Sequence, residues 1–245
     1  MKKVQFDEQI AASYDESSGH MYRPDVLDRA VDFLEELAGE GAALEFGVGT
    51  GRIALPLSGR GVPVHGIDIS EPMLEQLRRK PGSEPIAVTV GDFARTRVDG
   101  SFRLAYLVFN TITNLTTQDE QVACFRNAAV HLEPGGCFVI EVFVPQLRRV
   151  PPGERVRAFD VGRTHFGFDE YTDFAGQILY SHHYWIDGGN LRTFSAPYRY
   201  VWPAELDLMA RLAGMTLRQR WAGWTREPFT DESASHVSVW EKTGK

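Results

Sequence analysis

The spacing of hydrophobic and polar positions predicts alternating strands and helices over the first 144 residues. Between residues 24 and 38 apolar side chains recur at helical spacing, and Gly39 and Gly41 follow as helix stop signals. Short apolar runs predict buried strands at 43–46, 62–69, 86–92, 102–110 and 137–144. Further helices are expected between these strands, at 52–61, 71–80 and 118–132. Strands that alternate with helices over short connections are typical of a doubly wound α/β sheet with right-handed crossovers.

The pattern changes after residue 144. Residues 144–156 are rich in proline and arginine, which is typical of a linker. Three runs rich in aromatic and β-branched residues then predict antiparallel strands, at 165–173, 176–186 and 191–202. Gly188 and Gly189 separate the last two runs and indicate a hairpin turn. The sequence therefore predicts a late antiparallel insertion in an α/β domain.

The predicted hairpin sorts two neighbouring histidines onto opposite faces. Because side chains alternate along a strand, His183 shares one face with Trp185 and Phe194, whereas His182 and Tyr184 face the other way. The chain then returns to the main sheet with a helix at 203–214 and an antiparallel pair formed by 215–224 and 236–242.

Composition and charge narrow the class of protein. Of the 245 residues, 43% are hydrophobic and 24% are charged, which is ordinary for a chain with a buried core. The formal net charge of −7 offers no basic surface to a polyanion, so no nucleic-acid partner is expected. No apolar run is long enough to span a membrane and no secretory signal is recognised, so a cytoplasmic protein is expected. Cys124 and Cys137 are interpreted as free buried thiols, and no metal-ligand spacing is present, which predicts a metal-independent protein.

The segment LEFGVGTGR, residues 44–52, carries the strongest signal of chemistry. An apolar strand runs into Gly47, Gly49 and Gly51, and a helix is expected directly afterwards. Glycines let the backbone approach a ligand closely and adopt positive φ, while the start of a helix offers unpaired amides. A structural strand–helix turn is the alternative interpretation of such a loop.

Two carboxylates support the ligand-binding interpretation. Asp68 ends the next strand, where a carboxylate can accept both hydroxyls of a ribose, and Asp92 ends the third strand at the same edge of the sheet. A dinucleotide loop needs a third glycine at the position that Arg52 occupies. The pattern therefore favours a nucleotide other than NAD.

The order of these motifs resembles the class I S-adenosylmethionine-dependent methyltransferases. The matching segments are EFGVGTGR (45–52), GIDISEPML (66–74), GDF (91–93), FNT (109–111) and LEPGGCFVIE (132–141). The resemblance implies a Rossmann-like seven-stranded sheet and S-adenosyl-L-methionine as cofactor. A looser likeness connects the aromatic insertion with small-molecule N- and O-methyltransferases, including deoxysugar N,N-dimethyltransferases.

The resemblance also implies an organisation of the chain. Residues 1–23 would form a lid, and residues 24–150 the cofactor-binding core. Residues 151–202 would form the antiparallel insertion over the active site, and residues 203–245 the last helix and the closing β-hairpin of the core.

The resemblance assigns roles to individual residues. The three loop glycines would pass beneath the methionine half of the cofactor, with Glu45 orienting their loop. Asp68 would bind the ribose hydroxyls, and Ile69 would lie against the adenine. Asp92 would take the adenine amino group, with Phe93 supplying its backbone amide.

Three further residues would complete the cofactor site. Asn110 lies where the backbone of the family contacts the methionine amine and where side chains border the acceptor. Tyr14 and Arg23 fall in the lid, near the position of the cofactor carboxylate, which suits a guanidinium. A solvated charge is the alternative interpretation of Arg23.

Methyl transfer is an in-line displacement, so positioning and the exclusion of water dominate, and a base helps a hydroxyl or ammonium acceptor. His183 is the first candidate for that base and His182 the second, with plain packing as the alternative for both. Four residues of the preceding strand are second-rank acceptor contacts: His165, Asp169, Glu170 and Tyr171.

The expected function is transfer of a methyl group to an oxygen or nitrogen atom of a small metabolite. Alternatives are a catalytically silent cofactor-binding protein, a nucleotide-dependent oxidoreductase and a protein or RNA methyltransferase. The sequence does not identify the acceptor. A homodimer is one alternative for the oligomeric state.

Overall fold

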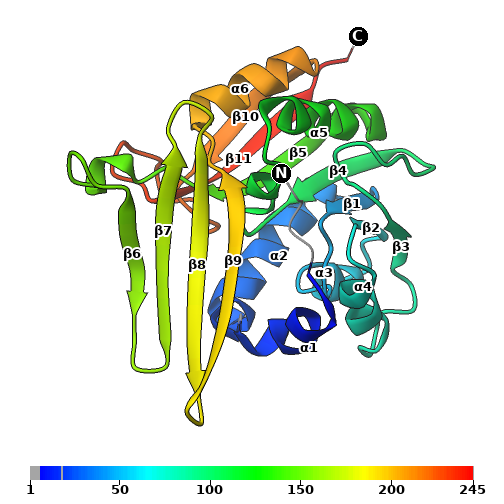
Figure 1. The fold of residues 1–245 in the computed structure, drawn as a ribbon. Coiled ribbons are helices and arrows are strands. Elements are labelled where there is room, and N and C mark those ends of the chain that lie inside the picture. The colour runs from blue at the N-terminus through cyan, green and yellow to red at the C-terminus, as the bar shows by residue number, and fades with distance from the viewer. Residues whose placement is uncertain (1–5, 18, 245) are drawn as a thin grey trace.

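The computed structural model describes residues 6–17 and 19–244, which form a seven-stranded and a four-stranded β-sheet (Figure 1). The strands of the larger sheet are β1 (Ala43–Phe46), β2 (Val64–Asp68), β3 (Ala87–Val90), β4 (Phe102–Leu107), β5 (Leu132–Phe143), β10 (Met215–Trp221) and β11 (Ser235–Lys242). The strands of the smaller sheet are β6 (Val156–Val161), β7 (His165–Asp173), β8 (Ile178–Asp187) and β9 (Asn190–Arg199).

Helices cover both faces of the larger sheet. They are α1 (Glu8–Ser17), α2 (Pro24–Ala38), α3 (Ala54–Gly59), α4 (Glu71–Arg78), α5 (Gln118–His131) and α6 (Pro203–Leu212), with short 3-10 turns η1 (Gly19–Tyr22), η2 (Thr111–Asn114) and η3 (Leu147–Arg149). The local sequence determines where some of these helices begin or end. Thr117 and Glu120 form a reciprocal capping box at the start of α5, and Gly39 ends α2 at φ 54°.

The larger sheet has the strand order β10-β11-β5-β4-β1-β2-β3. Strand β1 pairs in parallel with β2 and β4, whereas β11 is antiparallel to its neighbours. The chain reverses direction across the sheet between β1 and β4, and a crevice outside the carboxyl ends of strands at such a point is where open α/β sheets bind ligands. The predicted fold class, a Rossmann-like seven-stranded sheet with a late antiparallel insertion, is confirmed.

Two apolar layers enclose this sheet. One layer includes Cys124 and Phe125 of α5 and Met209 of α6, and the other includes Leu34 of α2 and Leu77 of α4. Both cysteines are buried free thiols, as expected. Because the central strands are covered on both sides, every residue of β1 is buried, which explains the unbroken apolar character of this run apart from Glu45.

The smaller sheet is antiparallel throughout, in the order β6-β7-β8-β9. Gly188 and Gly189 adopt φ of 53° and 85° in the turn between β8 and β9, and His183 pairs with Phe194, so the predicted hairpin register is confirmed. Strand β6 was not predicted. Its sequence follows a proline-rich segment, and it forms an edge of the sheet, where most of its residues are exposed.

The two faces of the smaller sheet have different surroundings. The inner face carries Asp169, Ser181, His183 and Tyr198, and the outer face carries His182, Glu170 and Tyr184 on the alternate positions. Arg192, on the inner face, donates from Nη1 to Oγ of Ser13 at 3.3 Å, so this face contacts α1, which Figure 1 shows beside β9. Near the core, Tyr171 and Leu179 of the same face pack with Phe143 and Leu147.

Several element boundaries differ from expectation, and β5 begins at Leu132, before the predicted start of that strand at residue 137. Helix α3 covers only Ala54–Gly59, and α6 ends at Leu212 with Ala213 as its C-cap. The predicted lid contains α1 and η1, while residues 1–5 and 18 of that segment lie outside the described residues. Within the described part of the chain, no helix is both long enough and apolar enough for a membrane crossing.

Candidate cofactor and acceptor site

The glycine loop follows β1 at the carboxyl edge of the sheet. Gly47, Gly49 and Gly51 have φ of 74°, 53° and 82°, values that side chains with a Cβ rarely adopt. A Cβ on Gly47 would stand 2.6 Å from Cγ2 of Thr111, and a Cβ on Gly51 would overlap the side chain of Leu77. All three glycines are therefore needed for the backbone conformation, and Gly47 and Gly51 are also needed for the close packing of this loop.

Asp68 ties the loop to the end of β2. Its Oδ2 accepts from the Gly49 amide and its Oδ1 from the Ser70 amide, each at 2.8 Å. Burial raises the pKa of this carboxyl, and the amides of Ser70 and Gly49 oppose the rise. Ile69, next to it, is 41% exposed at the edge of the sheet. A carboxylate that organises the loop and ends β2 fits the ribose of an adenosyl cofactor.

Glu45 lies beneath the loop with only 2% of its surface exposed. Its Oε2 accepts from the hydroxyl of Tyr106 at 2.8 Å. Burial raises the pKa of Glu45 to about 8, although Tyr106 and the charge of Arg52 lower it. The side chain also accepts a hydrogen bond from the backbone of Ala54, so it links the end of β1 to the start of α3.

Asp92 and Phe93 lie two and three residues beyond β3. Asp92 accepts from the Ala94 amide at 3.0 Å and begins the turn that follows the strand. The Phe93 ring stacks on Phe46 with 5.9 Å between centroids, and it is 8% exposed. The side chain of Phe93 therefore belongs to the core, and the role that the resemblance gives to this residue concerns its backbone alone.

Asn110 follows β4 in the left-handed region, at φ 61°. Its Oδ1 accepts from the Phe143 amide at 2.8 Å and thereby joins the turn to the end of β5. The contact between Thr111 and Gly47 brings this turn onto the glycine loop. The structure thus unites the β1, β2 and β4 ends around one site.

The two predicted cofactor-binding residues of the lid, Tyr14 and Arg23, have different surroundings. Tyr14 packs edge-on against Phe6 and raises the pKa of Tyr198, although burial is the larger cause of that rise. Arg23 instead forms an exposed ion pair with Asp25, with Nη2 at 2.9 Å from Oδ2.

Sequence reasoning missed a cluster that ties the lid to the glycine loop. Thr50 of the loop donates to Asp15 Oδ1 at 2.5 Å and lies 3.1 Å from the Tyr22 hydroxyl. Lys80 donates to the carbonyl of Thr50 at 2.7 Å and pairs with Asp15. Burial would raise the pKa of Asp15, but hydrogen bonds from Lys80, Thr50 and Tyr22 outweigh it, and the pKa is lowered. No spacing in the sequence brings these four residues together.

The inner face of the smaller sheet carries a connected row of polar side chains. His183 Nδ1 lies 3.1 Å from His165 Nε2, and His165 Nδ1 lies 2.6 Å from Asp160. On the other side, His183 Nε2 lies 3.4 Å from Ser181 Oγ, and Ser181 hydrogen bonds with Asp169. Burial, together with the charges of His165 and His182, lowers the pKa of His183 to about 4.

His182 lies on the outer face. Its Nδ1 is 2.8 Å from Ser195 Oγ, and its Nε2 is 3.3 Å from Glu170. The predicted separation of the two histidines onto opposite faces is confirmed, and only His183 shares a face with the residues that meet the lid.

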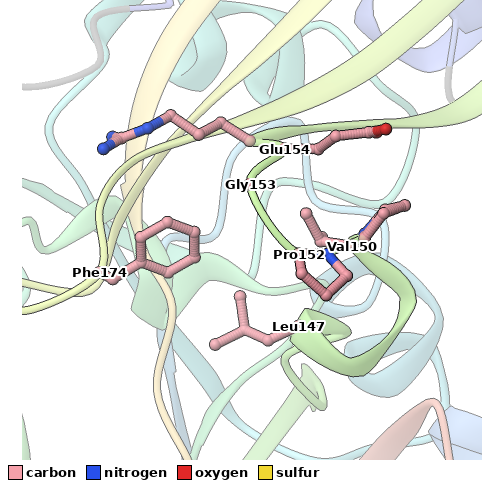
Figure 2. A pocket seen from close by; sticks show the side chains of 8 residues that line it. Leu147, Val150, Pro152, Gly153, Glu154 and Phe174 are labelled. Atoms are coloured by element: carbon pink, nitrogen blue, oxygen red, sulfur yellow. The ribbon is translucent and has the colours of Figure 1, made fainter.

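A separate hollow of about 320 Å³ lies between η3, the segment that follows it and Phe174 (Figure 2). Its lining includes Leu147, Val150 and Pro152, and it shares no residue with the glycine loop. Among the residues with described positions, no cluster of three or more histidine, cysteine, aspartate or glutamate side chains could hold a metal ion.

Comparison with known proteins agrees with this geometry. The methyltransferase domain family matches residues 43–136, which run from β1 into β5. The cypemycin N-terminal methyltransferase of Streptomyces sp. is 28% identical over 201 residues, 81% of this chain and 82% of that protein.

Solved structures extend the similarity to the whole chain. The CcbJ methyltransferase of Streptomyces caelestis is 36% identical with a TM-score of 0.89, and the match covers 100% of both chains. The amino pentose methyltransferase CalS10 of Micromonospora echinaspora, bound to its cofactor, shares the fold at 23% identity, with a TM-score of 0.70 over 99% of this chain and 100% of that one. The chain therefore belongs to the class I S-adenosylmethionine-dependent methyltransferases.

Proposed function

We propose that this methyltransferase acts on a nitrogen atom of a small molecule, and that the acceptor binds between the lid and the inner face of the smaller sheet. S-adenosylmethionine supplies the electrophilic methyl group. The chain's own residues have three tasks: to bind the cofactor at the β1, β2 and β4 ends, to hold the acceptor as an ammonium, and to take the proton whose loss frees the nitrogen lone pair that attacks the methyl group.

The observation that carries the proposal is the position of Asp169. This carboxylate lies on the inner face and influences the pKa of Tyr198, as Tyr14 of the lid also does. Burial raises the pKa of Asp169, while Ser181 and Arg157 oppose the rise. A carboxylate in such surroundings gains by pairing with a cationic ligand, so it suits an ammonium group better than a neutral hydroxyl.

His183 is the proposed base. Its place in the row from His165 to Ser181 supports this role, whereas its lowered pKa keeps the imidazole neutral near pH 7 and makes it a weaker base than an ordinary histidine. Ser181 connects it with Asp169, which would bring the base within one hydroxyl group of the bound amine. His165, supported by Asp160, orients the opposite ring nitrogen. His182 faces away from the lid and is the weaker candidate.

The relatives support nitrogen and leave the size of the acceptor open. The cypemycin relative is named as an N-terminal methyltransferase, so a peptide α-amine is a second candidate acceptor. Localisation in the cytoplasm and assembly as a homodimer stay predictions.

The proposal is tested with S-adenosylmethionine that carries a trideuterated methyl group. Aminosugars, cyclic secondary amines and short peptides would each be incubated beside the corresponding hydroxyl compound, and products identified by mass spectrometry. We expect label on nitrogen in the amine arm alone. Labelling of hydroxyl compounds only would refute the choice of nitrogen, and labelling of peptides only would favour the second acceptor.

The role of Asp169 is then tested with the acceptor so identified. D169N is expected to raise KM for the acceptor about ten- to hundredfold, the scale of a charged hydrogen bond, with little change in KM for the cofactor. E170Q is the matched control, because Glu170 is the next residue on the same strand and faces outward. Equal effects of the two substitutions would remove Asp169 from the site.

A further inference from the structure

The turn after β4 holds two consecutive non-glycine residues in a strained conformation. Phe109 and Asn110 have φ of 54° and 61°. A bulky side chain at positive φ is uncommon, and such residues persist only where the surrounding structure holds them. The contacts that hold this turn are therefore informative.

Glu141, on β5, makes two of those contacts. Its Oε2 accepts from the Phe109 amide at 2.9 Å, and its backbone carbonyl accepts from the Asn110 amide at 3.1 Å. Glu141 thus accepts hydrogen bonds from the amides of both strained residues. The side-chain Oδ1 of Asn110 in turn accepts a hydrogen bond from the Phe143 amide.

The second carboxylate oxygen of Glu141 is anchored elsewhere. Its Oε1 accepts from Nε1 of Trp224 at 2.8 Å. Trp224 lies between β10 and β11 and packs edge-on against Phe33 of α2, with 5.5 Å between ring centroids. The carboxylate therefore bridges two N–H donors, one in the strained turn and one fixed against the core.

The strained turn adjoins the cofactor site. Thr111, the next residue, approaches Gly47 so closely that a Cβ there would stand 2.6 Å from its Cγ2. The guanidinium of Arg52, at the end of the glycine loop, lies 5.5 Å from the centroid of the Phe109 ring. A shift of this turn would consequently displace the part of the loop expected to face the methionine half of the cofactor.

We propose that Glu141 is a positioning residue for the amino-acid half of S-adenosylmethionine, because its carboxylate clamps the Phe109–Asn110 turn to the core through Trp224. The inference depends on the cofactor and not on the proposed acceptor, so the two can fail separately. Glutamine cannot replace the carboxylate, since its single carbonyl oxygen can accept from only one of the two donors while its NH2 group opposes the other.

The test is calorimetric titration of E141Q with two ligands. S-adenosylhomocysteine contains the amino-acid half, and methylthioadenosine lacks it. We expect E141Q to weaken S-adenosylhomocysteine about tenfold or more, and methylthioadenosine less than twofold. E133Q is the matched control, because Glu133 lies on the same strand and pairs with Arg103 at 3.6 Å, and it should leave both affinities unchanged. Unchanged binding of S-adenosylhomocysteine, or equal loss for both ligands, would overturn the proposal.

Three further variants test the clamp even where E141Q is poorly folded. Glycine adopts positive φ without strain, so F109G removes the need for the clamp. Introduced into F109G, E141Q should weaken S-adenosylhomocysteine no more than threefold, and its melting temperature should approach that of F109G alone. W224F, which removes the anchor but keeps the carboxylate, should weaken the same ligand two- to fivefold. The same tenfold loss in both backgrounds, or no loss in W224F, would show that Glu141 does not act through the strained turn.

Discussion

The two sheets of this protein bury their residues in different ways. In the larger sheet, helices cover both faces, and β1 and β4 are almost completely buried. In the smaller sheet, one face lies against the lid and the core, and apolar residues such as Val161 and Leu191 are 74% and 65% exposed. The central strands of the larger sheet therefore contain few charged residues, and Glu45 is the one charged residue of β1.

This difference corresponds to a division of labour. The methyltransferase domain family matches residues 43–136, which contain the glycine loop, Asp68 and Asp92, and the match stops before the smaller sheet begins. A site for an invariant cofactor can be built from fixed backbone geometry, whereas an acceptor site needs side chains that vary between enzymes. Independent measurements of cofactor binding and of turnover therefore separate these two regions.

The largest effect, on cofactor binding, is expected from G49V in the glycine loop. Valine resists positive φ and fills space beside the loop, while a Cβ at this position meets only the flexible end of Met73, at 3.3 Å. We expect loss of S-adenosylhomocysteine binding by more than about a hundredfold, with the folded state retained in a thermal melt. Normal affinity for S-adenosylhomocysteine would show that the loop is only a structural turn.

The matching change in the proposed acceptor site, on the inner face of the smaller sheet, is H183A. Loss of a positioned base should lower single-turnover methyl transfer by roughly ten- to a thousandfold, while cofactor affinity stays unchanged. H182A is the control, because the same substitution on the outer face should have little effect on turnover. If H182A is the more damaging of the two, the assignment of the inner face is wrong. A lower melting temperature accompanied by lost cofactor binding would make His183 structural.

The smallest effect is a change of stability with pH, and it arises from Glu45 beneath the glycine loop. The pKa of Glu45 is about 8 in the folded protein and near 4.5 when unfolded, so the folded state binds more protons between these values. The free energy of unfolding should consequently fall as pH rises through this window, by the order of a few kcal/mol. E45Q cannot titrate, so its melting temperature should fall less between pH 5 and 8 than that of the wild type. Parallel curves for the two proteins would contradict the raised pKa.

The core of the molecule was predictable because its signals are local. The strand that contains Leu44 and Phe46 is apolar apart from Glu45, the loop that follows carries three glycines, and Asp68 ends the next strand. Each of these patterns reports a backbone requirement within a few residues. The hairpin turn at Gly188 and Gly189 is equally local, and it correctly placed His183 opposite Phe194.

Other features depend on residues that are distant in the chain. Strand β6 pairs with β7 at the edge of its sheet, and its short sequence directly follows the segment with Pro151 and Pro152 that the sequence predicts as a linker. The cluster of Asp15, Thr50 and Lys80 joins three separate elements.

The chain's local patterns thus specified most of the elements and the glycine loop, because strand and helix periodicity and positive-φ positions are properties of neighbouring residues, whereas the cofactor class came from the resemblance of the motifs to a known family. Tertiary packing alone placed Glu141 between Phe109 and Trp224, and turned Asp169 and His183 toward the lid. Such contacts form only when the sheets, helices and loops have docked. Their energies depend on burial and on partners that no short stretch of sequence contains.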